Sequence, residues 1–473
     1  MTTAMSLIIA LSIAGCAVGP DYRKPSTTLQ PFHSSAAPKA RRASASAPAL
    51  AQWWLGFDDP ELTRIAQQAL NRNLDLAAAI ARVEQARAVA REAGAQLLPT
   101  ADVTAQAARI HQSLQSPIGS IARNLPGFTR DQSQYDVGTA ASWEIDLFGG
   151  LRRGAQAARA EAQAAEAVQL GTRITVVADA ADAYLQVRGD QARIALAEKQ
   201  VSTDEHLLDL VERRFRAGLA TDREEAQAQA LLSEARASLQ PLAIDLEAQL
   251  NRLDVLMGAQ PGTYAAELSS RQEIPLPPAI PSDVTPADVL RRRPDVIAAE
   301  RRLAASNARI GEAIAEYYPK ISISGLLGFE SLSTGQLFKA ATFQPEAVAG
   351  LRWRLFDFGK IDAEVAGAKG ANCEALALYR QSILHAAEDV EDAFTALVQL
   401  QAHGEELKRE VAALKRARDS SQGAYAAGVI PLTDVLDADR QLLSAQDQLA
   451  LTRANTDQAA VQSFRAMGGG WGS

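Results

Sequence analysis

The chain of 473 residues contains one long unit of sequence written twice. The segment Asp75–Ala79 recurs 220 residues later as Asp295–Ala299. Further along the chain, the spacing between equivalent residues becomes 210, and it pairs Trp143 with Trp353. Two copies of a long unit indicate a duplicated structure, because a solenoid would show many short repeats. The fold must therefore be built from two similar halves.

Each half begins with a helical stretch that ends at a proline. We expect these helices over roughly Pro60–Leu98 and Pro294–Tyr318. Pro99 and Pro319 follow them, and a proline restricts its predecessor to extended backbone geometry, which stops a helix. The two prolines mark the same boundary in both halves.

Alternating segments follow each proline and predict strands. Tyr135–Thr139 and Ile321–Ser324 show the period of two that places unlike side chains on the two faces of a strand. Between the strands of the first half, Ser113–Arg130 contains Gly, Pro and Ser and is predicted to be a long loop. Each half therefore contributes two strands.

A very long helix follows the strands. Leu151–Phe215 contains no proline, and at about 1.5 Å per residue it would extend about 100 Å. Ile174, Val177 and Ala181 are spaced as neighbouring helices require for knobs-into-holes packing. The chain is 47% hydrophobic but only 5% aromatic, which favours long, closely packed helices. A turn at Gly218 reverses the chain into a shorter return helix.

Four strands are too few to close a barrel around a channel. Open strand edges are excluded from hydrocarbon, because each unpaired backbone group there costs several kcal/mol. Several chains must then share one barrel, and three copies would give twelve strands, although the pattern alone does not fix three. The predicted fold class is mainly α with β: a duplicated chain of long antiparallel coiled-coil helices forming an α-barrel, plus four strands per protomer in a shared transmembrane β-barrel. A plain coiled coil explains the helices equally well, but not the strands.

The N-terminus predicts export and lipid attachment. Leu7–Gly15 is a short apolar run ending in small residues, which is typical of a secretory leader. Cys16 follows at once, as in a bacterial lipobox, where the cysteine is acylated and becomes the first residue of the mature chain. A chance cysteine in an ordinary signal peptide is the alternative. The net charge of −8 argues against nucleic acid as a partner.

These boundaries give a predicted organisation: signal peptide 1–15, lipidated extended segment 16–52, first repeat 53–258, Pro-rich linker 259–285, second repeat 286–467 and flexible tail 468–473. The five histidines show no metal-ligand spacing, and no phosphate loop, HExxH or GxSxG pattern occurs. We therefore expect no cofactor, no metal and no enzymatic activity.

The ordered motifs resemble the TolC/OprM outer-membrane factors, and in particular their NodT-type lipoprotein branch. The resemblance covers nearly the whole mature chain. The motifs that carry it are Cys16–Tyr22 (CAVGPDY), Trp53-Trp54, Asn73–Leu76 (NLDL), Trp143–Gly149 (WEIDLFG), Arg291–Asp295 (RRRPD), Phe356–Gly359 (FDFG) and Asp434–Ala438 (DVLDA).

The resemblance implies a homotrimer with a twelve-stranded barrel in the outer membrane and a long α-helical tunnel in the periplasm. It implies the outer-membrane channel of a tripartite efflux system, a passive duct for drugs or other small molecules. A periplasmic adaptor (membrane fusion) protein and an inner-membrane pump of the resistance-nodulation-division type would complete the system. Ala17 after the acylated Cys16 fits a lipid anchor in the outer membrane.

Asp434 and Asp437 are candidate residues of a periplasmic gate. They lie three residues apart, on one face of a helix that starts after the turn at Gly428. Under threefold symmetry each would form a ring of three carboxylates that favours cations. In the related family, acidic residues at these positions line the closed periplasmic end. The alternative is two solvated aspartates stabilised near a helix start.

Three further positions belong to the predicted gate. The resemblance places Tyr425 and Glu224 at tip positions that help to hold some family members closed. Ile430 stands where the TolC type carries a basic residue, so that polar latch does not transfer intact. Leu432 suggests a more apolar constriction.

Three functions from different classes remain open at this point. The first is an export duct for small molecules, and the second is a duct of the same fold for type I protein secretion. The third is a surface-anchored coiled-coil scaffold that conducts nothing. The strand pairs and the duplication argue against the third, while the lipobox and the Arg-Arg-Arg-Pro-Asp segment favour the first.

Overall fold

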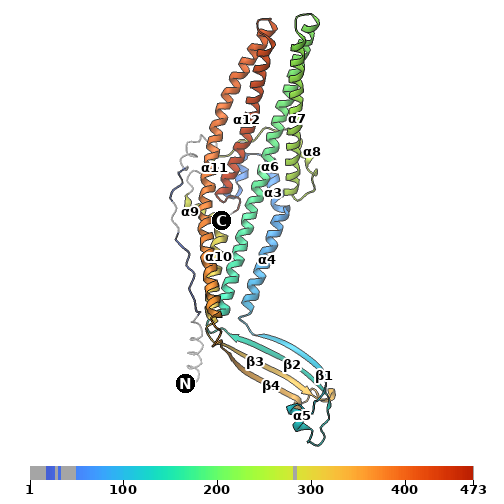
Figure 1. Ribbon diagram of the computed structural model, residues 1–473, viewed down its shortest axis with the longest axis vertical. Coiled ribbons are helices and arrows are strands. Elements are labelled where there is room, and N and C mark those ends of the chain that lie inside the picture. Colours follow the sequence, from blue (N-terminus) through green and yellow to red (C-terminus); the bar gives the residue numbers. More distant parts are fainter. Residues whose placement is uncertain (1–16, 27–29, 34–48, 281–284, 472–473) are drawn as a thin grey trace. The chain divides into compact units, whose positions relative to one another are not determined.

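The computed structural model describes residues 17–26, 30–33, 49–280 and 285–471 (Figure 1). Cys16 and the predicted leader lie outside the described residues. The chain divides into two compact units, and each unit takes segments from both repeats. We call them the strand unit and the helix unit. The strand unit holds the N-terminal segment to Pro25 with Glu84–Ala164 and Glu300–Leu378, and the helix unit holds Ser26–Val83, Ala165–Ala299 and Tyr379–Ser473.

The two halves of the chain share an order of two helices, two strands, a long helix and a return helix. In the first half the elements are η2 (Leu50–Phe57), α3 (Pro60–Arg72), α4 (Leu74–Ala95), β1 (Thr100–His111), α5 (Pro117–Ala122), β2 (Asp131–Ile145), α6 (Gly150–Arg216), α7 (Asp222–Leu256) and α8 (Ala265–Leu268). In the second half they are α9 (Pro286–Arg292), α10 (Pro294–Ala315), β3 (Lys320–Ser331), η3 (Thr334–Gln336), η4 (Ala340–Thr342), β4 (Phe343–Arg352), α11 (Lys360–Ala426) and α12 (Leu432–Ala466). Helices η2 and α8 have no counterpart in the second half, and η3 and η4 stand in place of α5. The bounds of α10 and β3 lie 220 residues after those of α4 and β1, and the bounds of α11 and α12 lie 210 residues after those of α6 and α7.

The four strands form one antiparallel sheet in the order β1-β2-β3-β4 (Figure 1). The central pair, β2 and β3, joins the two halves of the chain, with Thr139 opposite Leu327. In the described chain, β1 and β4 each have one unpaired edge. Long antiparallel helices, together with four strands among the described residues, confirm the predicted fold class.

Equivalent tryptophans fix the end of the sheet next to the helices. The indole Nε1–H of Trp143 donates to the carbonyl oxygen of Leu97 at 3.0 Å. In the second half, Nε1–H of Trp353 donates to the carbonyl oxygen of Tyr317 at 2.9 Å. Each acceptor lies just after a helix, where carbonyl groups lack helical partners. The same bond therefore ties strand to helix in both halves.

The prediction of one helix over Pro60–Leu98 was wrong in one respect, because the structure has two helices there, α3 and α4, which meet at Asn73. The side-chain Oδ1 of Asn73 accepts the backbone N–H of Leu76 at 3.0 Å, as a capping residue does. The predicted loop Ser113–Arg130 also contains a short helix, α5, whose start is capped by Ser116. Local capping by short polar side chains explains both differences.

The helix unit buries the residues whose spacing predicted packing. Ile174, Val177 and Ala181 of α6 are all buried. Helix α12 runs antiparallel beside α6, because Gln462 donates to Asp182 at 2.7 Å and Arg193 pairs with Asp447 at 2.7 Å. The core of this unit is thus a helical interface that also contains polar side chains.

The segment predicted to be a tail begins with packed residues. Gly468, Gly469 and Gly470 are buried, and the N–H of Gly470 donates to the carbonyl oxygen of Leu50 at 2.8 Å. Trp53 stacks on Phe464 with ring centroids 5.4 Å apart. Residues 468–470 therefore pack against η2 and α12 within the helix unit.

Gly258→Ala is expected to destabilise the protein much more than Gly218→Ala. Both glycines have positive φ, 70° and 75°. A Cβ at Gly258 would lie 2.3 Å from the carbonyl oxygen of Arg72, whereas one at Gly218 meets nothing within 4 Å. We expect a loss of roughly 1–2 kcal/mol from the backbone alone at Gly218 and about 1–3 kcal/mol more at Gly258. Thermal unfolding of the two variants tests this difference, and equal losses would contradict it.

Candidate functional site

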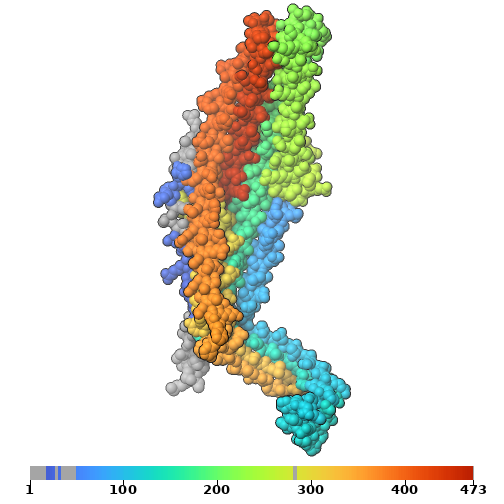
Figure 2. Space-filling model, viewed as in Figure 1, coloured from blue at the N-terminus to red at the C-terminus, as the bar shows by residue number. Residues whose placement is uncertain are grey.

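The candidate site is the end of the helix unit where two helical hairpins reverse. The α6–α7 hairpin turns at Gly218, and the α11–α12 hairpin turns at Gly428. We call the two turns and the helix ends that flank them the hairpin tip. In Figure 2 the two turns lie next to each other at one end of this unit, in green and orange-red. One buried cluster takes side chains from all four helices: Leu207, Val211, Ala228, Tyr425, Leu432 and Val435.

Tyr425 lies in the buried cluster and contacts an arginine from the other hairpin. The guanidinium of Arg214 stands over the Tyr425 ring, 4.6 Å from its centroid. Nη1 of Arg214 also donates to the backbone carbonyl oxygen of Tyr425 at 3.2 Å. Burial raises the pKa of the Tyr425 hydroxyl, and this hydroxyl makes no hydrogen bond within the described chain. Arg214 therefore links α6 to α11 at the hairpin tip.

No hydrogen bond joins Glu224 to Tyr425 among the described residues, although the charge of Glu224 contributes to the raised pKa of the Tyr425 hydroxyl. Its carboxylate accepts the backbone N–H of Thr221 at 2.7 Å and the hydroxyl of Thr221 at 3.0 Å, while the N–H of Glu224 donates to that hydroxyl. This reciprocal pattern is a capping box at the start of α7. Within one chain, Glu224 shapes the turn and leaves the contact with Tyr425 to Arg214.

Asp434 and Asp437 are exposed in the first turns of α12. The carboxylate of Asp437 pairs with Arg440 of its own helix at 3.3 Å. Asp434 has one weak contact, with the Thr433 hydroxyl at 3.5 Å. Both side chains are exposed, and they occupy the helix start that the alternative interpretation invokes.

Leu432 is fully buried beside Tyr425 in the cluster. Within one chain, Leu432 packs between the two hairpins. Leu219 and Val429, equivalent residues of the two turns, are exposed apolar side chains, and Phe215 at the end of α6 is partly exposed beside them. Leu432 therefore packs inside the tip, while Leu219 and Val429 lie on its surface.

Sequence reasoning missed two polar residues at this end of the unit. Arg214 follows Val211 by three residues and so lies on the same buried face of α6. This spacing would have distinguished Arg214 from Arg213 and Arg216, which point to other faces of the helix. Asp439 is buried, with Nε of Arg418 3.7 Å from its carboxylate. Burial raises the pKa of Asp439. Its helix position, two residues after Asp437, gave no signal for this burial.

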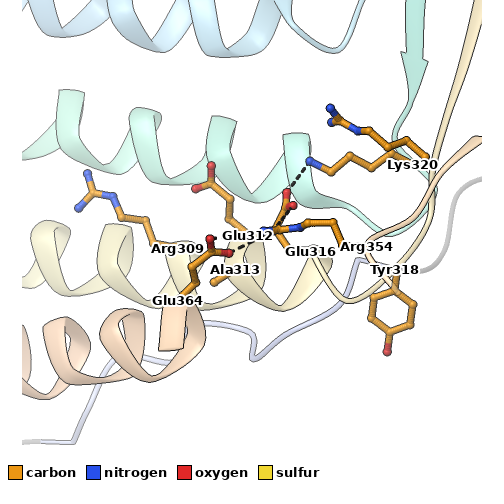
Figure 3. Close-up of a pocket in the computed structure, with 9 residues that line it drawn as sticks. Arg309, Glu312, Ala313, Glu316, Tyr318, Lys320, Arg354 and Glu364 are labelled. Carbon is orange, nitrogen blue, oxygen red and sulfur yellow. Dashed lines mark hydrogen bonds and ion pairs between the residues drawn. The ribbon is translucent and has the colours of Figure 1, made fainter. Parts of the chain in front are cut away.

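The strand unit has a separate charged cavity of about 610 Å³ at the base of the sheet. Figure 3 shows Glu316 between Lys320 and Arg354, and Arg354 also pairs with Glu364 at 3.1 Å. Burial alone would raise the pKa of Glu316, but these cations hold that pKa below its usual value. The ion pairs join Glu316, just after α10, to Lys320 at the start of β3 and to Arg354 just after β4. The charged side chains that line the cavity therefore connect the strands to the neighbouring helices through ion pairs.

Two searches of the described residues bear on chemistry and membrane insertion. The parts of the chain that the structure describes hold no group of three or more His, Cys, Asp or Glu side chains able to bind a metal ion. Among the described helices, none is both long enough and apolar enough to cross a membrane.

The fold and the hairpin tip define an outer-membrane efflux channel. The chain belongs to the outer membrane efflux protein family, whose model matches residues 65–259 and 285–469. The toluene efflux pump outer membrane protein TtgF of Pseudomonas putida is 31% identical over 99% of this chain and 96% of its own length. The pyoverdine export outer membrane protein OpmQ of Pseudomonas aeruginosa is 33% identical over 89% of this chain and 88% of its own.

Solved structures agree with this assignment. The outer-membrane channel OprN superimposes with a TM-score of 0.88 at 32% identity, covering 96% of this chain and 100% of OprN. The open state of the Neisseria gonorrhoeae MtrE outer membrane channel gives a TM-score of 0.81 at 27% identity, covering 96% and 99%. The predicted resemblance and the predicted channel function are confirmed.

Proposed function

We propose that three copies of this chain form a passive duct for small molecules across the outer membrane, without catalysis, in a tripartite efflux system. The observation that carries the proposal is the hairpin tip, where four helix ends pack around one buried cluster. Two exposed carboxylates, those of Asp434 and Asp437, lie at the same end. TtgF and OpmQ are named for toluene efflux and pyoverdine export, which favours small molecules over secreted proteins as cargo.

The proposed partners are a periplasmic adaptor protein and an inner-membrane pump of the resistance-nodulation-division type. Leu219 and Val429 support an adaptor at the tip, because each apolar side chain is about 70% exposed at the turn of its hairpin. Exposed apolar side chains grouped at one end of a soluble helical surface are typical of a docking site. Three protomers would present six such side chains around the duct.

The N-terminal segment supports the proposed lipid anchor at Cys16. Val18 N–H donates to the carbonyl oxygen of Phe148 at 2.9 Å, at the end of β2. Nε of Arg153 donates to the carbonyl oxygen of Val18 at 3.1 Å, and its Nη2 pairs with Asp21 at 2.9 Å. These bonds hold the residues after Cys16 at the base of the sheet, where an acyl chain would reach the same membrane.

The double variant Asp434→Ala/Asp437→Ala is expected to raise the conductance of the purified, acylated protein in a planar bilayer several-fold. Alanine at both positions widens the tip and removes any contact that the carboxylates make with a cation or a basic group across its closed form. Without the two carboxylate rings, the preference for cations should also fall. Glu406→Gln, which alters an exposed carboxylate along α11, is the matched control. Its conductance should equal that of the unmodified protein.

Two outcomes would count against the proposal. A trimer that stays silent even with both aspartates removed would return attention to a non-conducting scaffold. A monomer by mass in the same detergent would exclude a shared barrel. An unchanged current with unchanged selectivity would remove Asp434 and Asp437 from the gate but leave the duct.

A further inference from the structure

We propose that the charged cavity at the base of the sheet binds the anionic group of a small organic solute, a carboxylate or a phosphate, in the wall of the duct. The cavity has a volume of about 610 Å³, and all of its lining residues belong to the strand unit. Pockets that bind small molecules typically measure roughly 300–1,000 Å³. The proposal rests on the proposed duct and adds a ligand site to it.

The lining of the cavity carries more cations than carboxylates. The cations are Arg309 of α10, Lys320 of β3, Arg352 of β4 and Arg354. The carboxylates are Glu312 of α10, Glu316 and Glu364 of α11. A guanidinium group suits carboxylates and phosphates, because its planar fork can donate two parallel hydrogen bonds to either. The lining therefore favours an anionic ligand.

Most of these cations already have carboxylate partners. Glu316 pairs with Lys320 and, at 2.5 Å, with Arg354 (Figure 3). Arg309 pairs with Glu161 of α6 at 3.0 Å. These contacts fix the positions of three of the four cations, so the cavity is built before any ligand enters.

Arg352 is the exception among the lining cations. Its guanidinium makes no ion pair and no hydrogen bond within the described ranges of the chain, and the residue is exposed. Arg352 lies directly opposite Lys320 in the pairing of β3 with β4, so both side chains extend from the same face of the sheet. Arg352 therefore keeps its donors available for a ligand beside a second cation.

Glu312 opposes an anion less than an ordinary carboxylate would. In the part of the chain that the structure describes, its carboxyl group makes no ion pair and no hydrogen bond. Partial desolvation raises the pKa of Glu312, although the charge of Arg309 acts in the other direction. A carboxyl group with a raised pKa takes up a proton more readily and then carries no charge to repel the ligand.

The first repeat shows that the fold does not need this group of charges. The positions equivalent to Glu316, Lys320, Arg352, Arg354 and Glu364 hold, in that order, Gln96, Thr100, Ser142, Glu144 and Gly154. Trp143 and Trp353 nevertheless make the same bond from strand to helix in both halves. Joining the sheet to the helices therefore does not explain the cations of the second repeat, whereas a ligand does.

The alternation of β3 places the cavity on the polar face of the sheet. Lys320, Ser322 and Ser324 lie on one face of this strand, and Ile321 and Ile323 lie on the other. In a transmembrane barrel the apolar face meets lipid and the polar face lines the lumen. The cavity therefore opens toward the lumen, where a water-soluble anion reaches it and a lipid headgroup does not. Three protomers would carry three such sites.

Equilibrium dialysis with radiolabelled citrate tests the site on the purified, acylated protein in detergent, at fixed ionic strength. We expect saturable binding of one citrate per protomer. Arg352→Gln should weaken this binding at least about fivefold, because it removes a charge-assisted hydrogen bond that no other free donor replaces. Lys369→Gln makes the same change of charge at an exposed position of α11 in the same unit, and it should leave the affinity unchanged.

Glu312→Gln provides a gain of binding that a damaged fold could not produce. Removing the carboxyl group removes its residual repulsion of the ligand, so citrate should bind at least about threefold more tightly. Glu374→Gln changes the net charge equally at an exposed position of α11 and should have no effect.

Three results would overturn the site. The first is no saturable binding of citrate in a preparation that conducts, which would leave the duct intact. The second is equal affinity in Arg352→Gln and Lys369→Gln. The third is phosphatidylglycerol retained by the unmodified protein but not by Arg352→Gln in native mass spectrometry, with no citrate bound, which would show a lipid site instead. Citrate bound by a monomer that does not conduct would reject the duct and the placement in its wall, since one chain supplies the whole lining.

Discussion

The variant Arg214→Ala is expected to open the hairpin tip and raise the mean current through the channel at least about tenfold. The guanidinium of Arg214 lies 4.6 Å from the Tyr425 ring centroid and donates to the Tyr425 carbonyl oxygen. A desolvated cation–π contact stabilises by about 2 kcal/mol, and a tenfold change in population needs about 1.4 kcal/mol. Losing this link in each protomer should shift the tip toward its open arrangement.

Conservative and neighbouring variants separate a latch from a general loss of charge. Arg214→Lys keeps the charge but loses the planar group that stacks on an aromatic face, so it should give an intermediate current. Arg216→Ala removes an exposed arginine from the same helix end, where it pairs only with Glu212 at 3.5 Å. This control should leave the current unchanged. Equal currents for Arg214→Ala and Arg216→Ala would reject the latch.

The overall architecture could be predicted because the sequence is duplicated, so each element boundary is marked at two equivalent positions. Equivalent prolines, tryptophans and glycines marked the same boundaries in both halves, and the structure places α6 at Gly150–Arg216 against a predicted Leu151–Phe215. Long helices are governed by local periodicity, which a single sequence displays directly. The break at Asn73 and the short helix α5 escaped prediction because one capping side chain decided each of them.

The candidate site could be predicted only in part, because its contacts join distant segments. Asp434 and Asp437 were expected on one exposed helix face, and both are exposed. The contact between Arg214 and Tyr425 joins residues 211 positions apart in different hairpins. No local pattern encodes that distance, so the sequence placed Tyr425 at the tip but did not supply its partner.

Buried and half-buried carboxylates between α6 and α12 were also beyond prediction, and they make the stability of the protein depend on pH. Burial, with the nearby charge of Asp179, raises the pKa of Asp182 to about 7. Its Oδ2 accepts a hydrogen bond from Gln462 at 2.7 Å, and its other oxygen has no partner in the described chain. Burial also raises the pKa values of Asp190 and Asp204 to about 6.

The sign follows from the protons held in each state. In the unfolded chain Asp182 titrates near 3.8, and in the folded chain near 7, so between these values only the folded chain holds the proton. Stability must therefore fall as pH rises through this window. Each pKa unit corresponds to 1.36 kcal/mol, so Asp182 costs each protomer up to about 3 kcal/mol between pH 5 and pH 8.

Asp182→Asn should therefore raise the midpoint of thermal unfolding at pH 8 by several degrees and change it much less at pH 5. Asparagine keeps an oxygen for Gln462 and never has to lose a proton inside the helix interface. Asp190 and Asp204 titrate in both proteins, so the difference between the two curves isolates Asp182. Asp209→Asn, an exposed carboxylate that pairs with Arg213 on α6, should run parallel to the unmodified protein at both pH values. The prediction is wrong if the unfolding midpoint of Asp182→Asn also runs parallel to that of the unmodified protein from pH 5 to pH 8. Asp182 would then be ionised in the folded chain, and the polar side chains between α6 and α12 would have to be in contact with water.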